Sequence, residues 1–288
     1  MAVYICSKPL QIMVALILAK PKEDSLYLVD WFSDASRIAV SPALGRRFSE
    51  VKIFSSRARA MLAAGKSRYE QVFIDSDIGF KTYFCMLFLK IAGCKLIAVY
   101  EEGVGTYRND LIFGWRKFFF LALRGSCYFG QSPLVGRVLV FDSLRYQTLF
   151  PDSSNKVVKI PLLLQLWCER NVKLLKDVFA PGLVFDMPAN TLVRIYLTDW
   201  SVDLNLVERL AQEGELYVKP HPHIREALML GYQKKCPGVK WIPASVPAEL
   251  LFVLVLNAHN AAKVYHYGSS AVYYFVSDAI IDTLLVRN

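Results

Sequence analysis

The chain lacks a long hydrophobic run, although it is rich in apolar residues. Hydrophobic residues make up 54% of the 288 positions and charged residues 20%, a composition that raises the question of a membrane. No uninterrupted apolar run reaches the roughly 18 residues that a membrane-spanning helix needs. The N-terminus has neither a basic region before its apolar run nor a cleavage site, so we expect no signal peptide. These absences predict a cytoplasmic protein.

Paired cysteine motifs and a basic stripe are also missing. The six cysteines show no CxxC pair and no metal-binding spacing, which predicts buried free thiols in a reducing compartment. The formal charge of +9 suits nucleic acid, anionic lipid or a phosphate-bearing substrate. Nucleic acid is the weakest of these, because the basic residues are dispersed and no recognition motif is present.

One short segment mixes basic and large aromatic residues. Residues 115–120 read Trp-Arg-Lys-Phe-Phe-Phe, and Arg124 follows. This mixture is typical of a helix that lies in a membrane interface. A buried helix with a basic end is the alternative.

Short β-rich runs alternate with helical patterns along the whole chain. Strands are expected at residues 3–6, 26–31, 51–54, 71–74, 95–100, 137–141, 157–160, 192–197, 215–219, 239–242 and 262–267. Helices are expected at residues 10–18, 58–64, 80–92, 144–150, 162–179, 204–211, 224–232, 247–256 and 269–276. This alternation predicts an α/β fold with parallel sheets. Breaker residues at 180–182 and 187–190 place the boundary between an N-terminal domain, 1–180, and a C-terminal domain, 181–288.

An apolar run stops at two histidines, in the sequence Tyr-Val-Lys-Pro-His-Pro-His of residues 217–223. Pro220 and Pro222 have no amide donor, so strand pairing should fail there. His221 should then lie at the carboxyl edge of a sheet, where open α/β folds bind ligands. The alternative is a loop histidine with a satisfied hydrogen bond.

Gly268, Ser269 and Ser270 follow another predicted strand and begin a predicted helix. Free amides, two hydroxyls and the helix dipole together predict an anion site, and Gly268 lets the backbone approach a ligand closely. A plain serine N-cap is the alternative. Lys219 and His221 would bring further donors and positive charge, so a nucleotide phosphate is the expected ligand.

Two carboxylates end the strand predicted at residues 95–100. Glu101 and Glu102 precede Gly103, and such a pair is costly in a buried position unless it is solvated or used. One of them can take a proton from an attacking hydroxyl. Alternatively, Glu101 binds backbone amides and Gly103 only turns the chain.

In this order, the Glu-Glu-Gly, His-Pro and Ser-Ser stretches resemble three motifs of bacterial sialyltransferases, written D/E-D/E-G, HP and S/T. Lys8-Pro9-Leu10-Gln11, together with the Glu-Glu-Gly-Val-Gly-Thr-Tyr of residues 101–107, is most similar to glycosyltransferase family 52, the lipooligosaccharide sialyltransferases. The resemblance spans most of the chain. It implies a GT-B fold, with two Rossmann-like domains whose parallel sheets face a central cleft, an acceptor-side N-terminal domain and a donor-binding C-terminal domain.

The resemblance also implies a reaction, which is inverting, metal-independent transfer of sialic acid from CMP-sialic acid to a terminal galactose of a bacterial surface glycan. No cofactor is expected besides this co-substrate. His221 is expected to contact the CMP phosphate and to act as an acid toward the leaving group. The base is open between Asp199, which ends the strand before that of His221, and Glu102; we prefer Asp199. The other expected roles are donor binding for Lys219, Pro222, Gly268, Ser269 and Ser270, and orientation for Glu101 and Gly103.

The basic aromatic segment fits a lipid-linked acceptor and peripheral contact with anionic membrane at the inner face of the cytoplasmic membrane. A homodimer is compatible with this interpretation, and nucleic acid is not an expected partner. Two rival functions keep the fold. One is a glycosyltransferase that uses another nucleotide sugar such as UDP-glucose, and the other is a non-catalytic polysaccharide-assembly protein.

Overall fold

The computed structural model describes residues 1–122, 125–185, 190–258 and 260–286. Two all-parallel sheets, of seven and five strands, alternate with helices, as in two Rossmann-like domains of GT-B-like type. The expected α/β fold is therefore confirmed. Each sheet belongs to one of two compact units. Unit 1 comprises Met1–Trp31 and Ala35–Leu163, and unit 2 comprises Phe32–Asp34 and Leu164–Asn288.

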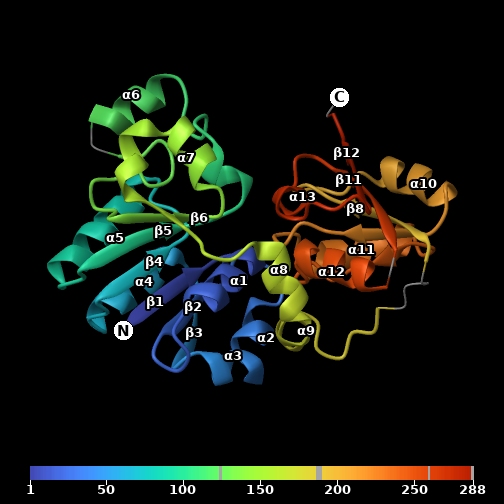
Figure 1. Ribbon diagram of the computed structural model, residues 1–288, viewed down its shortest axis with the longest axis horizontal. Coiled ribbons are helices and arrows are strands. Elements are labelled where there is room, and N and C mark those ends of the chain that lie inside the picture. The colour runs from blue at the N-terminus through green and yellow to red at the C-terminus, as the bar shows by residue number, and fades with distance from the viewer. Residues whose placement is uncertain (123–124, 186–189, 259, 287–288) are drawn as a thin grey trace. The chain divides into compact units, whose positions relative to one another are not determined.

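In the sheet of unit 1 the strands follow the order β3-β2-β1-β4-β5-β6-β7 (Figure 1). The strands are β1 (Ala2–Cys6), β2 (Ser25–Val29), β3 (Glu50–Phe54), β4 (Gln71–Ile74), β5 (Leu96–Tyr100), β6 (Arg137–Val140) and β7 (Val157–Lys159). The helices are α1 (Pro9–Leu18), α2 (Ala35–Ala39), α3 (Pro42–Arg47), α4 (Arg57–Lys66), α5 (Phe80–Ile91), α6 (Trp115–Ala122) and α7 (Ser143–Leu149), with short 3₁₀ helices at Val104–Tyr107 and Pro151–Lys156.

Alternation along these strands decides which helices cover which face. Val3 and Ile5 of β1 point to the same face, because side chains alternate along a strand, and they share a buried cluster with Met61 of α4 and Met86 of α5. Helices α4 and α5 approach closely, since a Cβ at Gly65 would lie 2.4 Å from the Phe88 ring. This contact is near the C-terminal ends of both helices. Their N-terminal turns lie at the carboxyl edge of the sheet, where Arg57 and Thr82 line one pocket.

Unit 2 repeats the topology of the first five strands of unit 1. Its sheet has the order β10-β9-β8-β11-β12. The strands are β8 (Leu192–Leu197), β9 (Leu216–Lys219), β10 (Lys240–Trp241), β11 (Ala261–His266) and β12 (Ile280–Leu284). The helices are α8 (Leu164–Arg170), α9 (Val172–Phe179), α10 (Leu204–Gln212), α11 (Glu226–Lys235), α12 (Ala248–Asn257) and α13 (Ser270–Tyr274).

The structure differs from the sequence expectation in the region before unit 2. The helix expected at residues 162–179 is two helices, which break at Asn171, where the side-chain amide bonds back to the carbonyl of Trp167 at 2.8 Å. Both helices pack against α12, and α9 buries Val178 and Phe179. They therefore belong to unit 2, whereas the boundary expected after residue 180 placed them in the first domain. Residues 187–189 of the expected linker lie outside the described residues.

Three elements were not expected from the sequence, namely α2, α3 and the edge strand β12. All six cysteines are buried free thiols, which confirms that expectation. Across the described ranges, no helix combines the length and apolar character that crossing a membrane requires.

Candidate active site

Three of the predicted site residues lie at one level of the carboxyl edge of unit 2. Leu197 of β8 pairs with Lys219 of β9 and with His266 of β11. Asp199, His221 and Gly268 each lie in the loop two residues after the end of one of these strands. The strand order changes direction between β8 and β11, and such a switch point is where open α/β sheets bind ligands.

His221 is oriented by hydrogen bonds from its own loop. Its amide donates to Oγ1 of Thr198 at 3.0 Å, and its Nδ1 accepts from the amide of His223 at 3.3 Å. Because Nδ1 accepts, the neutral ring carries its proton on Nε2. One ring nitrogen is thus satisfied locally, as the structural alternative expected, while the other is fixed as an N–H donor.

Trp200, which the motif analysis did not single out, stacks on both histidines of this loop. Its ring centroid lies 4.5 Å from that of His221 and 5.0 Å from that of His223. The two imidazole centroids are only 5.1 Å apart. If the imidazoles stacked on opposite faces of the indole, their centroids would be separated by two stacking distances, roughly 7 Å or more. Both histidines therefore lie over the same face of Trp200, and the tryptophan is 66% exposed. Its position next to Asp199 at a strand end was the available signal.

The turn at Gly268 is organised by a histidine that the sequence analysis also missed. Nδ1 of His266 accepts from the amides of Gly268 at 3.0 Å and Ser269 at 3.1 Å. Burial lowers the pKa of His266, although the charge of Asp282 on β12 acts to raise it. The ring is therefore a neutral acceptor. The amides of Gly268 and Ser269 are therefore not free for an anion, contrary to the expectation. Gly268 has a φ of +83°, which explains the glycine.

The serines keep only part of their predicted role. Helix α13 has five residues, and the Ser269 side chain makes no capping hydrogen bond. The plain N-cap alternative is thus not what the hydroxyl does. A phosphate at this strand end would meet serine hydroxyls more than a helix dipole, because a helix this short has few aligned peptides.

Lys219 lies inside unit 2 rather than at the open edge. It is 4% exposed, and its ammonium group bonds the carbonyl of Pro220 and, at 3.1 Å, that of Ala244. Burial lowers the pKa of Lys219 to about 7, against the charge of Glu249. Donor binding by Lys219 stays a prediction that this placement does not favour. Pro222 has a scaffold contact, since its carbonyl accepts from the amide of Ser33 at 2.8 Å.

The two glutamates that follow β5 in unit 1 have separate environments. Glu101 is fully buried, and its carboxylate accepts from the hydroxyl of Tyr107 at 2.8 Å and the amide of Phe141 at 3.0 Å. These bonds join the ends of β5 and β6, as the structural alternative for Glu101 expected. Gly103 has a φ of +108°, a conformation that favours glycine.

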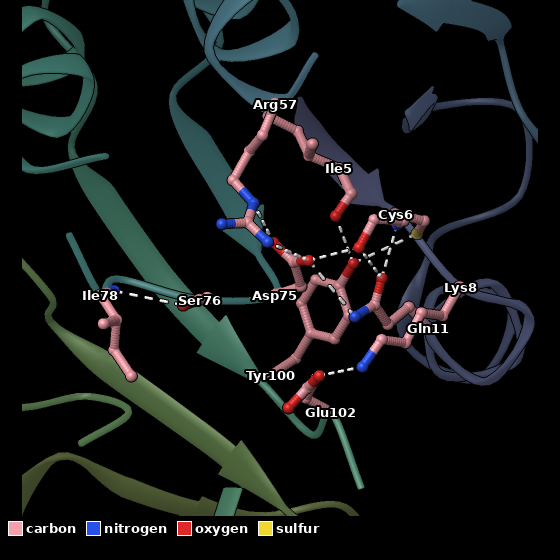
Figure 2. A network of polar contacts seen from close by, with 11 residues as sticks. Ile5, Cys6, Lys8, Gln11, Arg57, Asp75, Ser76, Ile78, Tyr100 and Glu102 are labelled. Atoms are coloured by element: carbon pink, nitrogen blue, oxygen red, sulfur yellow. Dashed lines mark hydrogen bonds and ion pairs between the residues drawn. The ribbon is translucent and has the colours of Figure 1, made fainter. Parts of the chain in front are cut away.

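Glu102 forms an ion pair with Lys8, shown in Figure 2. Lys8 follows β1, so the pair joins the Lys-Pro-Leu-Gln and Glu-Glu-Gly stretches, which are distant in sequence. Gly105 leaves room for the carboxylate, since a Cβ there would lie 2.3 Å from Oε2 of Glu102. The structure thus brings two of the predicted motifs together at the carboxyl edge of unit 1.

Beside this ion pair lies a buried polar network that the sequence analysis missed (Figure 2). Arg57 contacts Asp75 through Nε at 2.6 Å and Nη2 at 2.7 Å, and Ser7 donates to the same carboxylate at 2.6 Å. Burial by itself lowers the pKa of the Arg57 guanidinium. The charge and the hydrogen bond of Asp75 raise the pKa by more, so the net shift is upward. Asp75 directly follows β4, and the strand-end rule that selected Glu101 would have found it.

Asp75 and Asp77 form an Asp-x-Asp pair, a spacing that can bind a divalent cation. The expectation that the chain lacks such a pair, in agreement with a metal-independent reaction, is therefore wrong. Their side chains serve other partners: Asp77 accepts from the amides of Gly130 and Ser132, each at 2.9 Å. Burial raises the pKa of Asp77, against these hydrogen bonds. In the part of the chain that is described, no group of three or more His, Cys, Asp or Glu side chains is placed to hold a metal ion.

Comparison with protein-family models gives no match to this chain. A comparison with curated proteins likewise gives no significant similarity.

Proposed function

We propose that this protein is an inverting sialyltransferase that moves sialic acid from CMP-sialic acid to a terminal galactose of a surface glycan. The observation that carries the proposal is that Asp199, His221 and Gly268 follow the paired ends of three adjacent strands of unit 2. The motif resemblance named His221 and Gly268, and Asp199 was selected as a strand end. The register supports the proposal, because it brings these three distant stretches of sequence to one edge of the sheet.

The proposed reaction is one in-line displacement at the anomeric carbon. The acceptor hydroxyl oxygen forms a bond to this carbon as the bond from the carbon to the phosphate oxygen of CMP breaks. Asp199 takes the proton of the hydroxyl, and CMP leaves with the electron pair. The N–H of His221 on Nε2 and the hydroxyl of Ser269 then face the charge that grows on the phosphate.

Asp199 remains the preferred base. Glu102 already holds Lys8 in an ion pair, so proton transfer to Glu102 would cost that pair its charge attraction. Asp199 lies on the same sheet edge as His221, and Thr198 links the two backbones by accepting from the amide of His221 and donating to the carbonyl of Asp199. A base and a leaving-group contact on one rigid edge suit a single displacement.

We also propose that the acceptor is carried on lipid and that α6 contacts an anionic membrane surface. Phe113, Trp115 and Phe118 are 77%, 76% and 78% exposed, and the exposed Lys117 adds charge beside them. Exposed aromatics interleaved with bases fit an interface of anionic lipid. Arg124, also part of this prediction, lies outside the described residues. Sedimentation with vesicles of phosphatidylglycerol at low salt tests the contact. The double variant Trp115→Ser with Phe118→Ser should no longer sediment with the vesicles. Wild-type protein that does not sediment with them would contradict the proposed contact.

Calorimetry with CMP, CDP, UMP and UDP, without added metal, tests the nucleotide specificity. Wild type should bind CMP selectively, and His221→Ala should weaken that binding at least tenfold because the Nε2 donor is lost. His223→Ala is the matched control, since it removes the neighbouring imidazole from the same stack. It should change the affinity less than threefold.

The other outcomes separate the rival functions. Preference for UDP would keep the fold and make the protein a hexosyltransferase, while no nucleotide binding would contradict the whole proposal. Measurable hydrolysis of CMP-sialic acid would exclude a non-catalytic assembly protein.

A further inference from the structure

Unit 1 carries a small open pocket of about 90 Å³ that none of the predicted motifs includes. It lies at the carboxyl edge of the sheet, where Trp31 follows β2, Ser56 and Arg57 follow β3, and Lys81 and Thr82 follow Ile74 of β4 at the start of α5. This volume is below the range for small-molecule sites, roughly 300–1,000 Å³. The pocket can therefore receive the anionic group of a ligand, while the rest of the ligand lies against its rim.

Arg57 enters this pocket already oriented. Asp75 holds the guanidinium through two nitrogens, at 2.6 and 2.7 Å, and is itself buried and bonded by Ser7. Figure 2 shows the third guanidinium nitrogen directed away from Asp75. On the pocket side the guanidinium carbon lies 5.2 Å from the centre of the Trp31 ring. A cation fixed in this way loses little conformational entropy when it binds an anion.

The remaining walls have the chemistry of an anion site with an apolar side. Arg57 and Lys81 are the ionisable residues of the lining, and both are basic. Ser56 and Thr82 add hydroxyls at the first turns of α4 and α5, which have 10 and 12 residues, so their N-termini add positive potential. Ala58, Met61 and the 45% exposed Trp31 form the apolar side.

We propose that this pocket binds an acidic sugar, with its phosphate or carboxylate group between Arg57 and Lys81 and its ring against the wall that contains Trp31. The proposal goes beyond the transfer reaction, because it concerns unit 1 and does not require the nucleotide site of unit 2. It gives the protein a second specificity, for a negatively charged residue of a glycan.

Isothermal titration with glucose 6-phosphate, glucuronate, glucose and inorganic phosphate tests the pocket. Glucose 6-phosphate or glucuronate should bind the wild-type protein at least tenfold more tightly than glucose does, and the tighter of these two identifies the anionic group. Lys81→Ala should weaken the acidic sugar about tenfold, because a charge-assisted contact is lost. Lys66→Ala is the matched control, since it removes an exposed charge from the opposite end of α4.

Arg57→Lys gives a second measurement that does not leave Asp75 without a cation. It should weaken the acidic sugar more than Lys81→Ala does, because lysine lacks the planar fork, and it should leave CMP binding unchanged. Equal binding of glucose and glucose 6-phosphate would overturn the proposal, as would equal effects of Lys81→Ala and Lys66→Ala. Inorganic phosphate that binds as tightly as glucose 6-phosphate would overturn the sugar part and leave an anion site alone.

Discussion

The two sheets share a strand order, but their carboxyl edges carry different chemistry. In unit 1 the edge carries paired charges, Lys8 with Glu102 and Arg57 with Asp75. In unit 2 the corresponding edge presents Asp199, a histidine pair and an exposed Trp200. The comparison teaches that a Rossmann-like topology selects the place where ligands bind, while the strand-end side chains decide what is done there.

The largest expected effect is on the rate of transfer, which should depend on the carboxylate of unit 2 more than on that of unit 1. Asp199→Asn should lower transfer from CMP-sialic acid to a galactose-terminated acceptor by roughly 10²–10⁴-fold, the scale of a general base, with CMP binding retained. Glu102→Gln is the matched variant in unit 1 and should lower transfer less. Rates under saturating donor, with calorimetry for CMP, provide the measurement. If Glu102→Gln abolishes transfer and Asp199→Asn does not, the base lies in unit 1.

The next effect concerns the stability that the Arg57–Asp75 ion pair gives to unit 1. Asp75→Ala should destabilise unit 1 by about 3 kcal/mol, the lower end for a buried ion pair, because it leaves Arg57, whose side chain is 18% exposed, without its partner. The double variant Asp75→Ala with Arg57→Met should recover much of this loss, since both charges are then absent. Urea unfolding followed by tryptophan fluorescence measures both. A double variant as unstable as Asp75→Ala would show that the charge pair is not the cause.

A smaller effect tests the contribution of Trp200, at the carboxyl edge of unit 2, to CMP binding. Trp200→Ala should weaken CMP binding by about 1–3 kcal/mol, the value for a base that stacks on an aromatic side chain. Trp200→Phe should retain most of the affinity, because a ring still covers both histidines. Titration of CMP and of inorganic phosphate into each variant separates stacking from phosphate contact. Unchanged CMP affinity in Trp200→Ala would assign Trp200 to the support of His221 alone.

The effect that is smallest per unit of pH depends on Lys219 and accumulates over several units. Its pKa is about 7 in the folded protein and 10.5 in the ordinary state, so between these values the unfolded chain binds the extra proton. The contribution of Lys219 to the free energy of unfolding should therefore rise with pH in this window, by at most about 1.4 kcal/mol per unit. Below pH 7 both states are protonated, and this slope should vanish. Lys219→Met should remove it, which urea unfolding at pH 7, 8 and 9 measures; parallel profiles would contradict a buried neutral amine.

Much of the fold followed from local pattern, and the misses have physical causes. The wholly buried β1 and the Pro9 start of α1 were clear from a β-rich run and a proline at the first helical turn. β12 was missed because most of its side chains are exposed on an edge strand, where the apolar pattern is weak. The boundary at 180 differed because breaker residues mark a break in local structure, whereas the packing of α8 and α9 on α12 is tertiary.

The site shows the same division between local and tertiary information. Strand ends located Asp199, His221 and Glu102, because a parallel sheet aligns such ends whatever the rest of the chain does. The partner of each side chain could not be read in this way. Lys219 and His221 are two residues apart, yet one is buried against carbonyls and the other stacks on Trp200.

The sequence by itself determined the alternation of strands and helices, the parallel sheets and the strand ends where the candidate site residues lie, since periodicity and breakers act over a few residues. Only the tertiary structure decided that His266 takes the amides of Gly268 and Ser269, that Arg57 is oriented by Asp75, and that Lys8 meets Glu102. These choices depend on which distant side chains meet after burial. There the cost of an unpaired charge or donor, rather than local propensity, selects the arrangement.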